Sequence, residues 1–439
     1  MGPNKPTRVG LLVLGLYLGV TAFAQSTGQT VRHHRIAEQD SSAPPELTQA
    51  ESAIEKHDYA SAEPLLKKVV AADPNNFQAW FDMGFVYNGL GNVAESIAAY
   101  RKSVSAKPDV FESNLNLGLM LAKTGQPDAE QFLRAATTLK PTANVDEGHA
   151  SAWLSLALVL KTTKPDQAIE AYKQAAVLEP KDPEPHLSAG LLLEKENRFA
   201  DAEQEYRRAL ALDPASTDAL TGLANIYIRA QRYPDAEEIL GKITAMHPND
   251  LSARLQFARV LTSVGKNDDA TAQLQAAQKL DPANSLVQNE LGDLYMQSKK
   301  YDQAEALYRS MVAGEPNNAQ LHHYLGVALL RQRKYGDAQQ ELLIAVKLKP
   351  DFGEAYGDLA VAADENKSYA LAIKAADARA KFLPEIPVSY FLRASAYDHL
   401  RDYKMAAQNY HRFLELANGQ YPDQEWQARH RLIAIEPKK

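Results

Sequence analysis

The sequence predicts an all-α solenoid of about eleven antiparallel helix pairs followed by a capping helix. Prolines recur at a nearly constant interval, small residues recur in matched pairs, and the apolar residues of each unit fall at helical spacing. The composition is that of a folded chain, since 45% of the residues are hydrophobic and 23% are charged. Because a solenoid grows by adding units, 439 residues need not form several separate domains.

The proline interval gives the length of one unit. Ten prolines are separated by 34, 33 and 39 residues, and then by 34 residues six times in succession. These are Pro74, Pro108, Pro141, Pro180, Pro214, Pro248, Pro282, Pro316, Pro350 and Pro384. A fixed period in this range indicates a repeat array, in which each unit buries its apolar face against its neighbours.

Each unit contains two predicted helices. In residues 285–318, Leu291 and Tyr295 share one helical face and Tyr308 belongs to a second apolar face further along. Pro316 ends the second helix because it lacks an N–H group and clashes with the preceding turn. The polar segment between the two helices predicts an antiparallel pair.

Small residues occupy one position in each predicted helix. Two closely packed helices need small side chains where their axes cross. In the first helices these are Ala50, Gly84, Gly118, Ala157, Gly190, Ala224, Ala258, Gly292, Gly326, Ala360 and Ala394. In the second helices they are Ala62, Ser96, Ala129, Ala168, Ala202, Ala236, Ala270, Ala304, Ala338, Ala372 and Ala406.

With these residues in place, the chain resembles the tetratricopeptide repeat (TPR) proteins, whose 34-residue unit carries Trp, Leu-Gly, Tyr, Ala, an aromatic residue and Pro at set positions. The segments "WFDMGFVY" (80–87) and "LGDLY" (291–295) match that pattern, and the resemblance covers roughly residues 43–420. It implies a right-handed superhelix whose first helices line the concave side.

The array has one predicted irregularity. We assign repeats 1–3 to residues 43–141, an irregular connector to 142–149, and repeats 4–11 to 150–420. In units three and four the two small residues are 11 apart instead of 12, which predicts a shorter turn within each pair. Residues 421–439 read as a capping helix and tail, with Trp426 and Ile433 expected to face inward.

The N-terminal 24 residues have the layout of a secretory signal peptide. Lys5 and Arg8 precede an apolar stretch of 12 residues (9–20), and small residues precede a cut after Ala24. An uncleaved anchor is the alternative, but a span needs about 20 apolar residues. We therefore expect an exported protein, periplasmic or extracellular, that begins with a flexible polar leader at residues 25–42.

Charge and cysteine content narrow the classes of function. The chain has no cysteine, which excludes disulfides, thiolate metal sites and a cysteine nucleophile. Removal of Lys5 and Arg8 with the signal peptide changes the formal charge from −7 to −9. An acidic surface gains nothing from counterion release on a phosphate backbone, so nucleic acid is not the expected partner.

No catalytic motif is present. The sequence lacks HExxH, GxSxG, GxxxxGK[ST] and GxGxxG, so we expect neither an enzyme nor a cofactor. His322 and His323 are adjacent on a first helix, where side chains point about 100° apart and do not face each other. His322 takes the packing position that Trp80 holds in unit two, and we interpret it as a packed, satisfied histidine, with no metal site expected.

The TPR resemblance places a partner-binding groove on the first helices, and its character changes along the chain. Units two to five would present Phe81, Phe85, Leu115, Leu119, Leu154, Leu158, Leu187 and Leu191. Units six to nine would present Asn225, Arg229, Arg259, Asn289, Asp293, His323 and Arg331. The apolar residues either contact a partner or pack between repeats, and both interpretations stay open at this point.

These observations predict a non-enzymatic scaffold of the cell envelope that binds a protein or peptide along the groove. The alternative is an accessory TPR subunit of an envelope machine for polysaccharide synthesis, export or secretion. No integral membrane span is expected after cleavage, and association with a membrane complex belongs to the alternative. Val31 and Ile36 in the otherwise polar leader raise a further hypothesis, in which the leader itself fills the groove.

Overall fold

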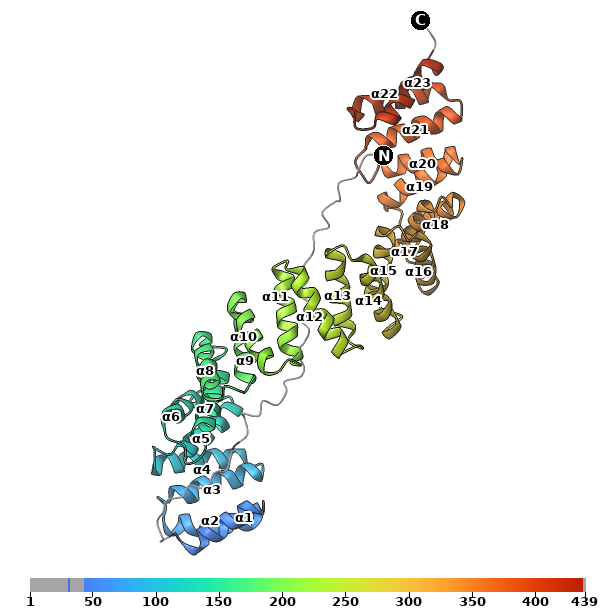
Figure 1. Ribbon diagram of the computed structural model, residues 1–439. Helices are drawn as coiled ribbons and strands as arrows, with labels where there is room; N and C mark the ends of the chain where they lie inside the picture. The colour runs from blue at the N-terminus through green and yellow to red at the C-terminus, as the bar shows by residue number, and fades with distance from the viewer. Residues whose placement is uncertain (1–30, 32–42, 437–439) are drawn as a thin grey trace. The chain divides into compact units, whose positions relative to one another are not determined.

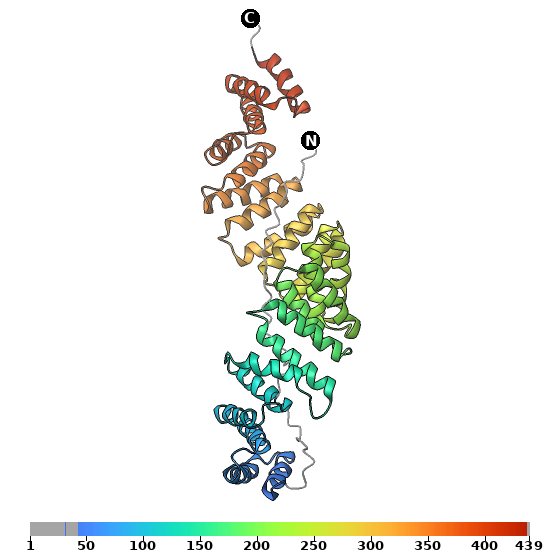
Figure 2. The same ribbon diagram turned by 90° about the vertical axis from the view of Figure 1, so that its left-hand side faces the viewer.

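A computed structural model describes residue 31 and residues 43–436, and every regular element in this part of the chain is an α-helix. The predicted signal peptide, and the predicted leader apart from Val31, lie outside the described residues. The described chain forms two compact units, residues 43–248 and residues 249–436. Each unit is a stack of antiparallel helix pairs (Figures 1 and 2), which confirms the predicted all-α helix-pair solenoid.

The first unit contains α1 to α12. In each pair the odd-numbered helix is the first helix of a repeat and the even-numbered helix is the second. The helices are α1 (Pro45–Glu55), α2 (Tyr59–Ala72), α3 (Phe77–Gly89), α4 (Val93–Ala106), α5 (Phe111–Lys123), α6 (Ala129–Thr138), α7 (Val145–Leu160), α8 (Pro165–Leu178), α9 (Glu184–Lys195), α10 (Phe199–Leu212), α11 (Thr217–Arg229) and α12 (Tyr233–Met246).

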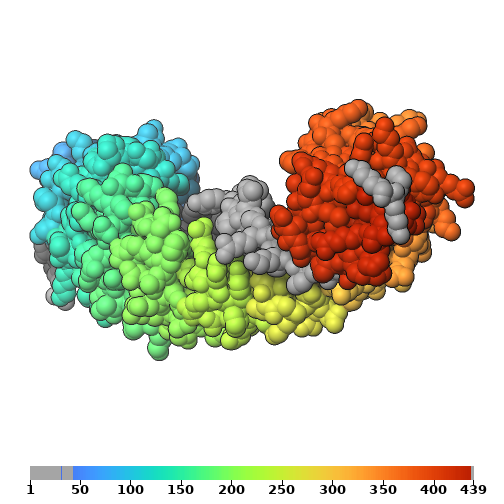
Figure 3. All heavy atoms as spheres, turned by 90° about the horizontal axis from the view of Figure 1, so that it is seen from above, coloured from blue at the N-terminus to red at the C-terminus, as the bar shows by residue number. Residues whose placement is uncertain are grey.

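The second unit contains five further pairs and the cap. Its helices are α13 (Leu251–Ser263), α14 (Asn267–Leu280), α15 (Ser285–Gln297), α16 (Tyr301–Gly314), α17 (Ala319–Arg331), α18 (Tyr335–Leu348), α19 (Gly353–Glu365), α20 (Tyr369–Arg379), α21 (Pro387–His399), α22 (Tyr403–Ala417) and α23 (Pro422–Ile435). Figure 3 shows that within each unit successive repeats abut in the order of the chain.

In every described pair except α7 and α8, the turn is built on one residue with a positive φ angle. That residue is glycine at Gly91, Gly125 and Gly265, and otherwise His57, Asn197, Gln231, Lys299, Arg333, Lys367 and Arg401. Non-glycine residues adopt this left-handed conformation only at a cost, so the surrounding helix packing must hold the turn in place. The turn between α7 and α8 has no such residue, as expected for the shorter turn predicted in unit four. In unit three the prediction is wrong, because Gly125 keeps the regular turn and the missing residue falls at the late start of α6 at Ala129.

The small-residue positions are confirmed as the helix crossings, since all of them are buried. A Cβ atom added at Gly84, Gly190 or Gly292 would lie 2.6 to 2.7 Å from a tyrosine ring on the second helix of the same repeat. The second helix therefore places a large side chain over each of these glycines. This contact explains why the position admits nothing larger than alanine.

Two predictions about irregular segments are wrong. Helix α7 begins at Val145, so residues 145–149 of the predicted connector are helical and the first helix of this repeat is longer than its neighbours. Asp146 and Glu147 in its first turn favour the positive end of the helix dipole and extend the helix backwards. In the cap, Trp426 and Ile433 point outward with 61% and 71% of their surface exposed.

The cap helix α23 instead buries Glu425, Ala428 and Leu432. Those residues lie three and four positions apart and form one stripe, whereas Trp426 lies about 100° around the helix from Glu425. Buried Glu425 accepts a hydrogen bond from Arg429 on its own helix, 3.1 Å away. The cap therefore covers the last repeat with a face that includes small and polar residues.

Candidate functional site

The structure divides the predicted apolar groove residues into two groups. Phe81, Leu115 and Leu119 are 1%, 5% and 7% exposed, so other parts of the protein cover them. Phe85 is half-buried with its ring edge-to-face against Tyr59, the centroids 6.0 Å apart. The burial of these residues fits packing between repeats and equally fits cover by another segment of the chain.

The second group of apolar residues is accessible. Leu154 and Leu158 on α7 and Leu187 on α9 are half-buried, and Leu191 on α9 is 44% exposed. They come from adjacent first helices in repeats four and five. A row of leucines that stays accessible on neighbouring helices is the type of surface that binds an apolar segment of a partner.

Three of the polar groove positions, Arg229, Arg259 and His323, contact neighbouring side chains. In the first unit Asn225 is half-buried, and the exposed Arg229 guanidinium lies over the Phe199 ring, 5.4 Å from its centroid. In the second unit exposed Arg259 donates a hydrogen bond to Glu290, with Nε 2.8 Å from Oε1.

The remaining polar positions belong to the second unit. Asn289, Asp293 and Arg331 are exposed. Although part of Asp293 reaches water, the surrounding protein partly desolvates its carboxylate, and this desolvation, followed by the charge of Glu290, raises the pKa of Asp293 above its ordinary value. His323 Nε2 lies 2.8 Å from a carboxylate oxygen of Asp358.

Helix α5 differs from the other first helices in having no exposed face over most of its length. All residues from Phe111 to Leu121 are buried, including Glu112, Asn114 and Asn116, which are 4%, 2% and 1% exposed. An amphipathic helix at a surface normally leaves one stripe in water. Something therefore covers the side of α5 that the TPR pattern assigns to the groove.

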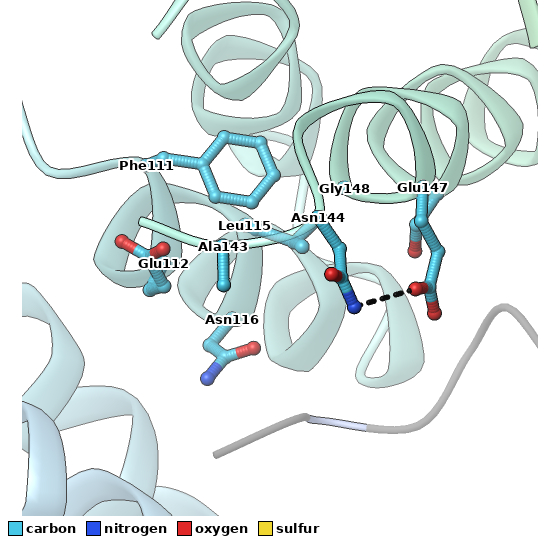
Figure 4. A pocket seen from close by; sticks show the side chains of 9 residues that line it. Phe111, Glu112, Leu115, Asn116, Ala143, Asn144, Glu147 and Gly148 are labelled. Carbon is cyan, nitrogen blue, oxygen red and sulfur yellow. Dashed lines mark hydrogen bonds between the residues drawn. The ribbon is translucent and has the colours of Figure 1, made fainter. Parts of the chain in front are cut away.

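A pocket lies between α5 and the extended start of α7 (Figure 4). Its lining combines aromatic, aliphatic and polar groups, namely Phe111, Glu112, Leu115, Asn116, Ala143, Asn144, Glu147, Gly148 and Ser151. Its volume of about 20 Å³ has room for about one water molecule, so it is far smaller than a typical ligand pocket.

Hydrogen bonds fix the walls of this pocket. Glu112 Oε1 accepts from the backbone N–H of Thr142 at 2.7 Å, which joins α5 to the connector. Asn144, held at φ 45°, donates through Nδ2 to Glu147 at 3.0 Å. At Gly148 a side chain would lie 2.9 Å from Pro141, so glycine lets the extra turn of α7 approach the connector.

Sequence reasoning missed the polar members of this pocket. Glu112 and Asn116 gave no signal, because the equivalent positions are polar in most other repeats. The one available signal was the insertion after Pro141, which we interpreted as connector instead of a site wall.

A second pocket lies in the first two repeats, between α2, α3 and α4. It has a volume of about 370 Å³ and is lined by Lys67, Val70, Trp80, Met83, Tyr87, Glu95, Ala98, Ala99 and Lys102. Trp80 donates from Nε1 to the carbonyl oxygen of Pro74 at 2.9 Å. This pocket was also missed, because Trp80 was interpreted only as a packing residue.

His322 is packed and satisfied, as predicted. It is 5% exposed, its Nδ1 lies 2.6 Å from Glu341 and its Nε2 lies 3.0 Å from the carbonyl oxygen of Pro316. The second contact repeats the bond between Trp80 and Pro74 in a different repeat. Across residues 43–436, no group of three or more His, Asp or Glu side chains is placed to hold a metal ion. No helix in the same range is long and apolar enough to cross a membrane.

Stacked antiparallel helix pairs define the class of the protein, a helical-repeat array, and this fold suggests a role in protein–protein interaction. A family model described as the cilia and flagella-associated protein 70 C-terminal domain matches residues 37–290, and tetratricopeptide repeat models match residues 261–325, 295–363 and 387–420. The first match covers more than half of the chain, so the chain belongs to that family, and its repeats are tetratricopeptide repeats.

Individual relatives are distant. Tetratricopeptide repeat protein 37 of Xenopus laevis is 32% identical over 87 residues, which are 20% of this chain and 6% of the length of that relative. Among solved structures, YrrB, titled a TPR protein with an unusual peptide-binding site, is 22% identical with a TM-score of 0.37, over 43% of this chain and 96% of that one. The Cut9–Hcn1 hetero-tetramer structure is 17% identical with a TM-score of 0.36, over 88% of this chain and 96% of that one.

Proposed function

We propose that this protein is a non-enzymatic scaffold that binds an apolar segment of a protein or peptide partner on the first helices α7 and α9. One observation carries the proposal, the accessible row of Leu154, Leu158, Leu187 and Leu191 on these adjacent helices. An amphipathic helix or an extended apolar peptide can bury such a row, and apolar burial contributes about 25 cal/mol per Å². The neighbouring pocket between α5 and α7 adds polar groups that can orient the partner.

We also propose that the protein works outside the cytoplasm, as a soluble or complex-associated component of the cell envelope. Support comes from the signal-like layout of residues 1–24 and from the absence of cysteine throughout the chain. In the alternative, the protein is an accessory subunit of an envelope machine. It would then use the same surface to bind a membrane component of that machine.

Site-specific photo-crosslinking in intact cells tests this proposal. A photoreactive residue at Leu191, on first helix α9, is expected to give one discrete protein adduct. The control is Val177 on second helix α8, which is also aliphatic and is 74% exposed. Adducts at both positions, or at Val177 alone, would contradict binding on the first-helix row.

Fractionation of the same cells separates the two locations of the partner. A soluble client is expected to release the adduct into the periplasmic or extracellular fraction. An adduct that sediments with membranes assigns the partner to a membrane complex.

A further inference from the structure

Val31, the one described residue of the leader, lies against the folded repeats. It is half-buried and packs on the apolar cluster formed by Phe81, Ile97, Tyr100, Leu117, Met120, Leu121 and Ala129. Phe81 is a predicted groove residue on α3, and Leu117, Met120 and Leu121 belong to α5. The leader therefore contacts the part of the array where the groove residues are buried.

The helices α3, α5 and α7 each carry an acidic side chain in this region of the array. Asp82 on α3 and Glu112 on α5 are both 4% exposed, and Glu147 lies at the start of α7. Asn116 donates to the hydroxyl of Tyr100 at 3.5 Å, and the charge of Asp82 contributes to raising the pKa of that tyrosine, after burial as the main cause. Asp82 and Asn116 thus both lie near the cluster on which Val31 packs.

The leader has the complementary chemistry. Residues 31–36 read Val-Arg-His-His-Arg-Ile, an aliphatic residue at each end of four basic ones. We propose that this segment binds over α3 and α5 as an intramolecular ligand, through apolar contact with the cluster on which Val31 packs and through attraction between its basic residues and the carboxylates of Asp82, Glu112 and Glu147. This occupant accounts for the absence of an exposed face on α5.

The tether is long enough for this arrangement. Val31 precedes Ala43, where the described repeats begin, by 12 residues. At about 3.3 Å per residue an extended chain of this length spans roughly 40 Å. Packed helix axes lie about 8–10 Å apart. A segment of this length that starts before α1 can therefore reach the first helices of repeats two and three.

The proposal has a consequence for partner binding, and this consequence alone rests on the proposed function. A short tether holds the leader at a millimolar effective concentration, so a leader with a Kd of about 0.1 mM would leave its groove open roughly a tenth of the time. The partner site on α7 and α9 adjoins the covered helices. A partner that extends toward α5 must displace the leader. A partner segment that is basic and has aliphatic ends, like residues 31–36, would compete for the same groove.

Thiol labelling in the full-length mature chain tests the proposal without any partner. The chain has no native cysteine, so Leu119→Cys on α5 provides a single reporter. We expect the double substitution Val31→Asp and Ile36→Asp in the leader to raise the maleimide labelling rate of that thiol about tenfold. In the same leader variant, a thiol at core position Leu274, 2% exposed on α14, should label at an unchanged rate.

A second measurement checks specificity. A synthetic peptide of residues 25–42, added at millimolar concentration to the leader variant, should restore protection of the thiol at position 119. The same peptide with Arg32→Glu and Arg35→Glu should not protect it. Equal labelling rates with intact and substituted leader, or equal protection by both peptides, would overturn the proposal, whatever the crosslinking at Leu191 shows.

Discussion

Tyr206 gives the sharpest test of how the repeats pack. Its ring, on α10, is fully buried between two glycines, Gly190 on the first helix of its own repeat and Gly222 on the first helix of the next. A Cβ atom at Gly222 would lie 2.3 Å from ring atoms Cε2 and Cζ, well inside the separation of about 3.5–4.0 Å at which carbon atoms attract. The opposite side of the ring lies close to the backbone of Gly190, where an added Cβ atom would be only 2.7 Å from it. The ring therefore has little room to move away from position 222.

Gly222→Ala should therefore destabilise the protein, although alanine is the better helix former. Overpacking a core costs about 1–3 kcal/mol, and the change from glycine to alanine in a helix returns up to about 1 kcal/mol. We expect a net loss of about 1–2 kcal/mol. Gly314→Ala is the matched control, since a Cβ there meets nothing within 4 Å. That substitution therefore shows the effect of helix propensity without a clash.

Urea unfolding followed by circular dichroism gives the total effect. Hydrogen exchange at α9, α10 and α11 shows where it arises, because repeats in an array can open separately. Tyr206→Leu should relieve the clash, because leucine lacks the Cε2, Cζ and hydroxyl atoms that a Cβ at position 222 would meet. If Gly222→Ala is as stable as Gly314→Ala, or costs the same with leucine at position 206, the sandwich of Tyr206 between two helices does not control stability.

Three further predictions concern single side chains. His322→Ala should lower the free energy of unfolding by about 1–3 kcal/mol, because it leaves Glu341 and a backbone carbonyl without their buried partner. His322→Gln should lower it less. Thermal unfolding of the two variants measures the difference. Burial, its main cause, raises the pKa of Asp364 to about 6, and one of its buried carboxylate oxygens has no hydrogen-bond partner among the described residues. The folded state therefore binds the proton more tightly than the unfolded state, so this group favours folding below about pH 4 and that contribution is lost as the pH rises to 6. Asp364→Asn should stabilise the protein by about 1–2 kcal/mol at pH 7.5, after allowance for partial solvent screening, and by nearly nothing at pH 4; urea titrations at the two pH values would contradict this if the gain were equal. Trp426→Ala should change stability by less than about 0.5 kcal/mol, whereas Leu432→Ala, on the buried side of the cap, should cost about 2–4 kcal/mol in the same assay.

The periodic part of the fold could be predicted from the sequence because one packing problem is solved in every repeat. The small residue at each helix crossing and the proline after each second helix recur, so an error in one unit is corrected by the others. The cap has no such repetition. Trp426 and Ile433 were assigned to its inner face on hydrophobicity alone, but a one-residue change of register places Ala428 and Leu432 there instead.

The groove was harder to predict because exposure at a groove position depends on what lies beside it. The same position is 7% exposed at Leu119 and 44% exposed at Leu191, although both are leucines on first helices. What differs is the surroundings, where α7 gains an extra turn and the leader supplies Val31 beside α5. Neither effect can be read from the residue itself or from the repeat pattern.

These two departures from periodicity meet at one place in the chain. The extra turn of α7 forms a wall of the pocket on α5, and Val31 packs on the apolar cluster to which α5 contributes. A perfectly regular array would present the same surface in each repeat and could not restrict a partner to one register. An insertion and an N-terminal segment that both act on α5 make the third and fourth repeats unlike the rest. Recognition is therefore expected at this boundary, and the labelling of a thiol at position 119 measures directly whether the leader controls access to it.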